Sequence, residues 1–438
     1  MDKLNQELNF KFDNGILSEK RLEQFKKIVF DEISVINEAL SSKKYVNDFA
    51  SLLLPDETKF LEESQKLSKN YSDFSELVVI GIGGSNLGAL AVIESLKGLY
   101  HSNGKNIYFA DTTDSFKIFD LLKVLEKKVE KGKKIILNLI SKSGSTTESI
   151  ANFEVFLHFL KKHFPKTYSS QIIFTTDKNS PLDLIAKSHK YKVLHIPKKV
   201  GGRYSVFSNV GLFPLSFMGI DTKQFLQGAK DMKKQCLKKS TQNPALMSCL
   251  TLFNSAFEKK RIVNHFLFVT QLKSFGIWYR QLLGESIGKE FSKDSKLKIN
   301  FGLTPTYAIG STDLHSMAQL YLGGPNNTYH VFVNVKNTPT IKLPIEKEYE
   351  QIVSNIQGKN LDQIMQAIYA GTKQSFIQKN IPFSEIELTN LNEYTIGALL
   401  QMKMFEVIYL GLLLDVDPFD QPNVEEYKSH TRAILKNG

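Results

Sequence analysis

The sequence is poor in the features that mark secreted and membrane-bound proteins. Its 438 residues include only 2 cysteines, Cys236 and Cys249, too few for a disulfide framework in a chain of this length. Nowhere does it approach the run of roughly 20 apolar residues that spans a membrane. The opening stretch, MDKLNQELNFKFDNG, mixes charges with apolar side chains and lacks the apolar core of a signal peptide. These absences predict a cytoplasmic protein that is not attached to a membrane.

The chain also lacks the long basic runs of many nucleic-acid-binding proteins. Its formal net charge is +11, from 56 Lys and Arg against 45 Asp and Glu. The lysines form scattered pairs, as in Lys127-Lys128 and Lys198-Lys199. There is no zinc-finger spacing and no aromatic signature of an RNA-binding domain. We therefore expect most of these lysines to lie on a solvated surface, with no nucleic-acid partner.

What the sequence does contain is an alternation of apolar runs and helical patterns. With 42% hydrophobic residues it can bury sizeable cores, and its length suggests two or three domains. From residue 77, short apolar runs typical of buried parallel strands alternate with segments of helical periodicity. We expect strands at 77–80, 107–110, 135–140, 172–174 and 193–196, and helices at 87–99, 115–131, 148–162 and 181–187.

A second alternation follows a helical stretch at 222–260. Strands alternating with helices favour right-handed crossovers and parallel sheets covered by helices on both faces. The sequence thus predicts an α/β fold with two αβα sandwich domains, at residues 71–220 and 221–414. Residues 1–70 are expected to form a helical N-terminal arm, and residues 415–438 a C-terminal tail with a last helix. In the second domain we expect strands at 266–269 and 330–335 and helices at 275–284, 315–321, 361–380 and 395–414.

A hydroxyl-rich turn follows the expected strand at 135–140. Residues 141–147 read SKSGSTT and lead directly into a helical pattern. The N-terminus of a helix has unpaired backbone N–H groups and a partial positive charge, so it can hold an anion. Hydroxyls, Lys142 and a flexible glycine in such a turn predict a phosphate-binding loop. An ordinary Ser/Thr helix cap would use the same residues, so this loop alone leaves both interpretations open.

A glycine-rich loop, GIGGS at 81–85, follows the first expected strand. It is similar to a dinucleotide-binding fingerprint, with Asp111 at the next strand end, but that pattern needs glycine where the chain has Asn86. We therefore expect these glycines to let a backbone approach a ligand closely, with Ser85 forming a hydrogen bond to it. This loop and SKSGSTT both follow expected strands at their carboxyl ends, where ligands bind in parallel sheets.

Two charged residues elsewhere suit oxyanion or acid–base chemistry. Arg203 follows a glycine pair, and its forked donors suit an oxyanion; a surface salt bridge is the alternative. Glu285 follows an apolar helix end in QLLGESIGK. The neighbouring Leu282, Leu283 and Ile287 could desolvate its carboxylate and make it a general base, whereas most isolated glutamates are simply solvated.

Two more candidates lie toward the C-terminus. His315 could exchange protons near neutral pH, although a structural histidine bonded to a carbonyl is the commoner case. Lys428 lies in DQPNVEEYK, where Asn423 and Glu426 are spaced like a helix-capping pair. That spacing would place Lys428 on the first turns of the last helix, where a lysine is normally just exposed.

Taken together, in order and spacing, these motifs resemble the phosphoglucose isomerase (glucose-6-phosphate isomerase) family of bacterial type, within the sugar-isomerase (SIS) superfamily. The resemblance runs from about residue 78 to 435. Its motifs are GIGGS at 81–85, SKSGSTT at 141–147, GGRYSVFSNVGL at 201–212, GESIGK at 284–289, the segment around His315, and DQPNVEEYK at 420–428.

The resemblance implies a dimeric enzyme of glycolysis and gluconeogenesis, without metal or cofactor, that interconverts glucose 6-phosphate and fructose 6-phosphate. It implies that Glu285 carries a proton between C2 and C1 and that Arg203 stabilises the enediolate. His315 and Lys428 would serve ring opening, with the histidine supplied by the partner subunit. The residues implied to bind the sugar and its phosphate are Ser85, Ser141, Lys142, Ser143, Thr146, Gln281 and Gln421.

Some positions depart from the family's usual pattern. Ser143 and Ser145 stand where threonines are common, which keeps the hydroxyls. Asn423 stands where glycine is usual, and asparagine tolerates a left-handed backbone better than most residues. Glu426 stands where a small residue is usual, and it could pair with Lys428. These changes concern the fine structure of the tail.

Three other functions fit parts of the pattern. A non-catalytic sugar-phosphate sensor of the same SIS fold would keep the hydroxyl loop but would not need Glu285, Arg203 and Lys428 together. Such a sensor usually carries a DNA-binding domain, and no segment here resembles one. A dehydrogenase would have to bind a nicotinamide cofactor. An isomerase that also accepts mannose 6-phosphate would share every motif, so the sequence leaves that alternative open.

Overall fold

The computed structural model describes residues 3–15, 17–100, 104–294 and 296–437. The chain divides into two units. Unit A contains residues 34–233 and 396–398, and unit B contains residues 1–33, 234–395 and 399–438.

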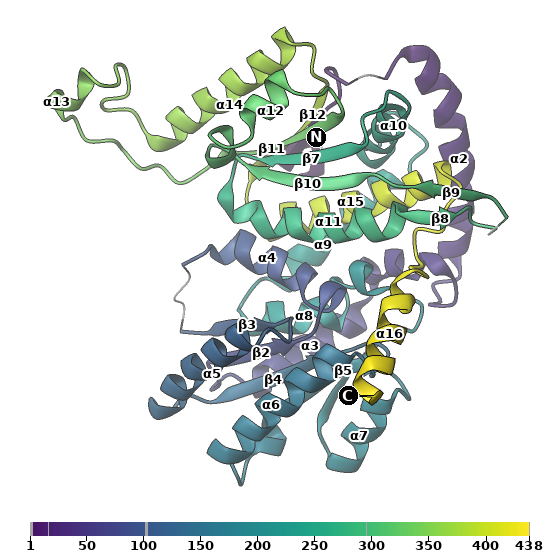
Figure 1. Ribbon diagram of the computed structural model, residues 1–438, viewed down its shortest axis with the longest axis vertical. Helices are drawn as coiled ribbons and strands as arrows, with labels where there is room; N and C mark the ends of the chain where they lie inside the picture. The colour runs from purple at the N-terminus through teal and green to yellow at the C-terminus, as the bar shows by residue number, and fades with distance from the viewer. Residues whose placement is uncertain (1–2, 16, 101–103, 295, 438) are drawn as a thin grey trace. The chain divides into compact units, whose positions relative to one another are not determined.

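A five-stranded parallel sheet forms the centre of unit A (Figure 1). Its strands lie in the order β3-β2-β4-β5-β6, and every neighbouring pair is parallel. The chain leaves β2 toward β3 on one side and then returns to β4 on the other side, so the direction of winding changes between β2 and β4. The strands are β2 (Glu76–Ile80), β3 (Asn106–Ala110), β4 (Ile135–Ile140), β5 (Ile172–Asp177) and β6 (Lys192–Ile196).

Helices cover both faces of this sheet, because right-handed crossovers that run in opposite directions place their helices on opposite faces. Phe156 and Leu125 from helices, and Leu137 and Phe174 from strands, belong to one apolar core on the face covered by α5, α6 and α7. On the other side, α4 and α3 both contact α8. The helices are α3 (Thr58–Asn70), α4 (Leu87–Lys97), α5 (Ser115–Glu130), α6 (Thr147–His163), α7 (Pro181–His189) and α8 (Asn209–Phe217).

Unit B is built on a second five-stranded sheet, in the order β1-β12-β11-β7-β10. β10, β7, β11 and β12 are parallel, whereas β1 runs antiparallel to β12. The winding reverses between β7 and β11, so both units share one strand order in their parallel part. The strands are β1 (Leu8–Lys11), β7 (Ile262–Leu267), β10 (Thr304–Ile309), β11 (Thr328–Asn337) and β12 (Phe383–Asn390).

Helices also lie on both faces of the second sheet (Figure 1). Phe332 and Phe383 of the strands pack with Tyr369 and Phe376 of α14, and Tyr321 of α12 joins the same core. The opposite face carries α11, whose Gly276 lies so close to β10 that an added Cβ would come within 2.8 Å of Tyr307. The helices of unit B include α10 (Pro244–Phe257), α11 (Lys273–Ile287), α12 (Ala318–Gly323), α14 (Leu361–Gln378) and α16 (Val424–Asn437).

The remaining elements complete the chain. Three long helices carry residues of both units: α2 (Glu19–Ser41), α9 (Thr222–Cys236) and α15 (Glu393–Leu413). An antiparallel pair, β8 (Lys289–Phe291) and β9 (Lys298–Phe301), follows α11. Short helices are α1 (Lys3–Glu7) and α13 (Lys347–Glu350).

The predicted α/β class with two parallel αβα units is confirmed. The prediction missed the short pair β8 and β9 and three strands of the second five-stranded sheet, β1, β10 and β12. β1 lies within the segment predicted to be helical and pairs antiparallel with β12, so the second sheet is not wholly parallel. β10 contains Pro305, which suits the edge strand that β10 forms. β12 carries Glu385, a residue uncommon in buried strands; there it is paired with Lys373 and Tyr369.

The expectation that no stretch is apolar enough to span a membrane was wrong for α15. By length and composition alone this helix could cross a membrane, with a mean hydropathy of 1.5. In the structure, however, 89% of that window is buried inside the protein, as in a core helix. The helix also carries two fully buried charges, Lys403 and Glu406, which pair with each other at 2.7 Å.

Candidate functional site

In unit A, two predicted loops lie where the winding of the sheet reverses. GIGGS follows β2 at Ile80, and SKSGSTT follows β4 at Ile140, and these two strands are neighbours. Side chains and backbone groups at the carboxyl ends of such a strand pair form the usual ligand site of open α/β sheets. The fold therefore brings both loops together at the carboxyl end of one sheet, as expected.

Internal hydrogen bonds shape the hydroxyl loop. The Ser141 and Thr146 hydroxyls lie 3.0 Å apart, and the Ser141 hydroxyl also accepts the Gly144 N–H at 3.2 Å. Gly144 has a φ of +72°, which glycine adopts without strain. Ser143 is exposed, and its hydroxyl accepts the Ser145 N–H at 3.3 Å. The loop is therefore closed on itself with Ser143 and Ser145 facing outward.

Thr146 occupies the N-cap position of α6. Among the residues that the structure describes, its side chain accepts no capping hydrogen bond from the first turn of the helix. An ordinary Ser/Thr cap would accept a first-turn N–H. The plain capping interpretation therefore does not account for Thr146, and the first N–H groups of α6 remain available to an anion.

Positive charges surround this loop. Lys142 is partly buried, and burial lowers its pKa, an effect that nearby Asp177 opposes and that Lys199 and Lys198 reinforce. Burial likewise raises the pKa of Asp177, against the field of Lys142 and Lys198. Of these three lysines, Lys199 is paired with Asp48 at 2.9 Å. Lys142 and Lys198 then face the single carboxylate of Asp177, and this balance favours an anionic ligand.

The glycine loop packs backbone to backbone against the segment that carries Arg203. A Cβ added to Gly84 would lie 2.1 Å from the carbonyl carbon of Gly202 and 2.4 Å from the Arg203 nitrogen. Ser205 strengthens the contact, because its hydroxyl lies 3.4 Å from the Gly84 oxygen and 2.7 Å from the Gly202 oxygen. Ser85 ends the glycine loop and is partly exposed. The glycine loop that follows β2 and the Arg203 segment that follows β6 therefore meet in unit A.

Arg203 itself is buried, at 3% exposure, and its guanidinium lies 5.3 Å from the centre of the Tyr204 ring. This burial argues against the alternative of a surface salt bridge. Asp111, the candidate ribose ligand of the dinucleotide interpretation, instead accepts a hydrogen bond from Asn86 at 3.0 Å and pairs with Lys117. These contacts occupy the carboxylate that a nicotinamide cofactor would need.

In unit B, Gln281 and Glu285 lie one turn apart on α11. The Gln281 amide nitrogen donates to Glu285 Oε1 at 3.0 Å. Glu285 remains partly exposed, whereas Leu282, Leu283 and Ile287 are fully buried. Gln281 Oε1 is buried and has no hydrogen-bond partner among the described residues. A ligand hydroxyl placed there would satisfy this acceptor.

Lys289 ties the end of α11 to the C-terminal segment, and the sequence prediction gave it no role. Its ammonium donates to the backbone oxygen of Glu285 at 3.1 Å. It also donates to Asp420, to the backbone oxygen at 2.6 Å and to Oδ1 at 2.8 Å. Gln421 follows Asp420 directly, so the structure brings Gln421 close to the end of α11. The one available signal was the spacing of Lys289 four residues after Glu285 within GESIGK.

Lys428 lies on α16 and is partly buried. The possible pairing with Glu426 was wrong, because the partner of Lys428 is Glu425 at 2.7 Å. Asn423, predicted to pair with Glu426 in a helix cap, donates to Glu290 Oε2 at 3.0 Å instead. Residues three apart lie on one face of a helix, whereas residues two apart do not, which explains the preference for Glu425.

His315 lies at the opposite end of the second sheet from Glu285. It follows β10 and a short turn, and its side chain is exposed. Glu285 lies near the start of β10, because a Cβ on neighbouring Gly284 would be 3.7 Å from Pro305. β10 has six residues, roughly 17 Å at about 3.3 Å per residue. Within one chain these two predicted catalytic residues are therefore not brought together.

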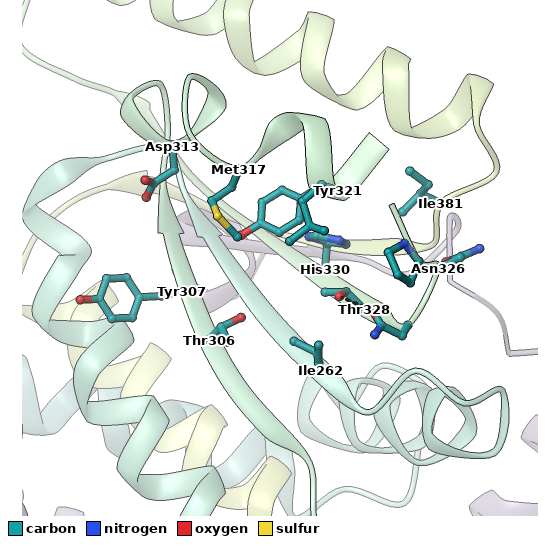
Figure 2. A pocket seen from close by; sticks show the side chains of 13 residues that line it. Ile262, Thr306, Tyr307, Asp313, Met317, Tyr321, Asn326, Thr328, His330 and Ile381 are labelled. Carbon is teal, nitrogen blue, oxygen red and sulfur yellow. Dashed lines mark hydrogen bonds between the residues drawn. The ribbon is translucent and has the colours of Figure 1, made fainter. Parts of the chain in front are cut away.

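Figure 2 shows a cavity of about 380 Å³ in unit B, lined by Thr306, Met317, Tyr321 and His330 among others. None of the predicted site residues lines it. Burial lowers the pKa of His330 to about 3, so its ring is neutral. A neutral imidazole, mostly apolar walls and the carboxylate of Asp313 do not suit a sugar phosphate.

The fold and the loops define an α/β protein with two open-sheet αβα units, one of which carries a hydroxyl-rich loop where its winding reverses. The description of the family model that matches residues 21–438 is phosphoglucose isomerase. The chain belongs to the phosphoglucose isomerase family.

Two relatives illustrate this membership. A probable glucose-6-phosphate isomerase of Methanococcus maripaludis is 34% identical over 445 residues, covering 99% of this chain and 95% of the relative. The glucose-6-phosphate isomerase of Carboxydothermus hydrogenoformans is 32% identical, over 87% of this chain and 83% of the relative.

Two solved structures share the fold. A hypothetical protein of Thermus thermophilus matches with a TM-score of 0.87 and 28% identity, over 98% of this chain and 99% of that one. A glucose-6-phosphate isomerase of Chlamydia trachomatis matches with a TM-score of 0.81 and 21% identity, over 100% of this chain and 91% of that one.

Proposed function

We propose that the protein interconverts D-glucose 6-phosphate and D-fructose 6-phosphate, in glycolysis and gluconeogenesis, through ring opening and an enediolate intermediate. The observation that carries this proposal is that a chain of this family holds a partly exposed carboxylate, Glu285, oriented by the Gln281 amide at 3.0 Å. Aldose–ketose isomerisation needs one base that takes a proton from C2 and returns it to C1. A carboxylate held at one position can do both.

The hydroxyl loop would bind the phosphate. Ser141, Ser143 and Thr146 supply hydroxyls, Lys142 supplies charge, and the uncapped start of α6 supplies backbone N–H groups. The phosphate is remote from the reacting carbons, so its binding energy can hold the sugar in register during the proton transfer. Ser85, at the end of the glycine loop, would line the sugar site.

Arg203 would stabilise the enediolate. Its charge is permanent, and burial places it in a medium where it acts more strongly than in water. A preorganised donor at a developing oxyanion contributes on the order of 3 kcal/mol of barrier lowering. Gln281 has a buried, unpartnered oxygen for a substrate hydroxyl, and Gln421 would line the same region through the contact between Lys289 and Asp420.

Ring opening needs an acid and a base at the ring oxygen and the anomeric hydroxyl, for which we propose His315 and Lys428. Because β10 separates His315 from Glu285 within one chain, the histidine that acts beside Glu285 would come from the partner subunit. The exposure of His315 fits this role.

A segment that projects from unit B supports a homodimer. Figure 1 shows α13 at the tip of an extended excursion between β11 and α14. Three large apolar side chains there are mostly exposed: Ile345 at 66%, Tyr349 at 54% and Ile352 at 75%. A partner subunit would cover such side chains. Replacing Ile345 and Ile352 with aspartate should shift the mass measured by light scattering from dimer to monomer, whereas Leu184→Asp, in unit A, should leave it unchanged.

We also propose domain limits at 1–70, 71–220, 221–414 and 415–438, a cytoplasmic location, and catalysis without metal or cofactor. The cysteines Cys236 and Cys249 are free thiols, as a reducing compartment favours. The proposed chemistry is proton transfer alone, so activity should be unaffected by EDTA.

The decisive experiment for the activity is a coupled assay of glucose 6-phosphate formation from fructose 6-phosphate, with EDTA present. The wild-type protein should turn over. Glu285→Gln should lose at least roughly 1,000-fold in kcat and still bind fructose 6-phosphate in calorimetry. Glu130→Gln, an exposed carboxylate in unit A, serves as the matched control and should be fully active. Binding by the wild type without turnover would favour the sensor, and near-normal turnover by Glu285→Gln would refute the assigned base.

A mixed-dimer experiment tests the origin of His315. Homodimers of His315→Ala and of Glu285→Gln should both be inactive. A dimer containing one chain of each has one site with both wild-type residues, so it should recover about half of the wild-type activity. Inactive mixed dimers, verified by mass, would contradict a histidine supplied across the interface.

A further inference from the structure

An ion pair lies in the core of unit B, outside the proposed catalytic residues. Lys403 and Glu406, both on α15, have 0% exposure. Glu406 accepts from three donors: Lys403 at 2.7 Å and Ser248, both through Oε2, and the Tyr279 hydroxyl at 2.6 Å through Oε1. The Lys403 ammonium also lies 5.0 Å from the centre of the Tyr279 ring. This cluster joins α10, α11 and α15.

Stability alone does not explain a buried ion pair. Apolar side chains of similar volume usually stabilise a core as well as a buried pair does, because the charges must be desolvated. The neighbouring histidine, His265, adds no hydrogen bond to the pair, because both of its buried ring nitrogens lack partners among the described residues. The His265 ring is 4.1 Å from the Tyr279 ring, and burial together with Lys403 keeps it neutral. A role in orienting a neighbouring side chain therefore explains the pair better than stability does.

The cluster can control how far α11 is rotated about its own axis. Tyr279 is two residues before Gln281 and six before Glu285, so it lies about 200° and 240° around the helix from them. The other large side chains on the core side of α11, such as Trp278 and Leu282, are apolar, and their packing is not directional. Ser274 and Ser286 are also buried on this helix. A hydrogen bond to a carboxylate is short and directional, so it can fix the angle at which the opposite face is presented.

A small rotation has a large effect on the reacting group. A side-chain tip lies roughly 5 Å from the axis of a helix, so a rotation of about 10° moves it by about 1 Å. A misplacement of that size can reduce catalysis by on the order of 100-fold. The Tyr279–Glu406 hydrogen bond therefore lies where it can set the position of the Glu285 carboxylate.

We propose that Glu406 is a positioning residue for isomerisation: it accepts the Tyr279 hydroxyl and thereby fixes the rotation of α11 that presents Glu285 and Gln281 to the sugar. Lys403 and Ser248 hold the Glu406 carboxylate for this purpose. The inference rests on the proposed function of Glu285.

Two double variants separate positioning from stability. Lys403→Met with Glu406→Gln removes both charges and keeps an acceptor for Tyr279. Lys403→Met with Glu406→Met also removes both charges but leaves Tyr279 without an acceptor. We expect the first to keep kcat within about 3-fold of the wild type. We expect the second to lose about 10- to 100-fold in kcat with KM within about 3-fold, because phosphate binding in unit A is untouched. Both should unfold at similar temperatures.

Equal kcat in the two double variants, or losses that follow only the folded fraction, would overturn the inference. If either variant does not fold, Tyr279→Phe decides, because it deletes only the hydroxyl. It should lower kcat with little change in KM, and unchanged kcat would overturn the inference. A wild-type protein without isomerase activity would instead refute the proposed function, so the two failures are distinguishable.

Discussion

The contact between the glycine loop and the Arg203 segment is so close that one methyl group should disturb the site. In Gly84→Ala, the new Cβ would lie 2.1 Å from the Gly202 carbonyl carbon, where an ordinary contact is about 3.5 Å. The two segments would have to separate by roughly 1.4 Å. Overpacking of this kind costs about 1 to 3 kcal/mol. In a domain of 150 to 250 residues each kcal/mol lowers Tm by about 2 to 4 °C.

The same separation would displace Ser85 or Arg203 from the substrate. A misplacement near 1 Å can cost about 100-fold, so we expect kcat/KM to fall by about 10- to 100-fold in the isomerase assay. Gly371→Ala is the matched control. Gly371 is exposed within α14, and an added Cβ meets nothing within 4 Å. That change should stabilise the protein by about 0.5 to 1 kcal/mol without affecting activity. A Gly84→Ala variant with wild-type kcat/KM and Tm would refute the reasoning.

Three further predictions concern charge. Lys142→Met should raise KM by about 10- to 100-fold with a small change in kcat; a fall in kcat at constant KM would contradict a phosphate ligand. The pKa of His330 is about 3 when folded and about 6.5 when unfolded, so stability is complete above pH 6.5 and falls as the pH drops toward 3. Urea titrations should show about 2 kcal/mol lost between pH 6.5 and 5, and His330→Phe should lack this loss. Hydrogen bonds from Lys187 and His195 hold the pKa of buried Asp183 well below its usual range, so their stabilisation is present above about pH 4 and lost in acid. Asp183→Asn should therefore cost about 1 to 3 kcal/mol at pH 7 and progressively less in acid.

The first sheet was largely predictable because its information is local. A parallel strand buried on both faces is a continuous apolar run, and the strand predicted at 135–140 is β4 (Ile135–Ile140). The second sheet was harder to predict. β10 begins TPTY and β12 contains Glu385, so neither shows that pattern. Their positions depend on pairing with β7 and β11, which lie far away along the sequence.

The candidate site divides in the same way. The contact between Gln281 and Glu285 follows from helical spacing and could be expected from the sequence. The link from Lys289 to Asp420 crosses 131 residues and could not. Glu406 is hidden for another reason: a charged side chain in a helix usually indicates a solvated face, and only the packing reveals a buried one.

The most direct test of the central claim, that Glu285 moves a proton between C2 and C1, is isomerisation in deuterated water. The wild-type protein should convert fructose 6-phosphate into glucose 6-phosphate that carries deuterium at C2 in part of the product, because a carboxylate base exchanges its proton with solvent during some turnovers. Glu285→Gln should give neither conversion nor deuterium within the same time. Undiminished conversion by Glu285→Gln, or no conversion by the wild type, would contradict the claim.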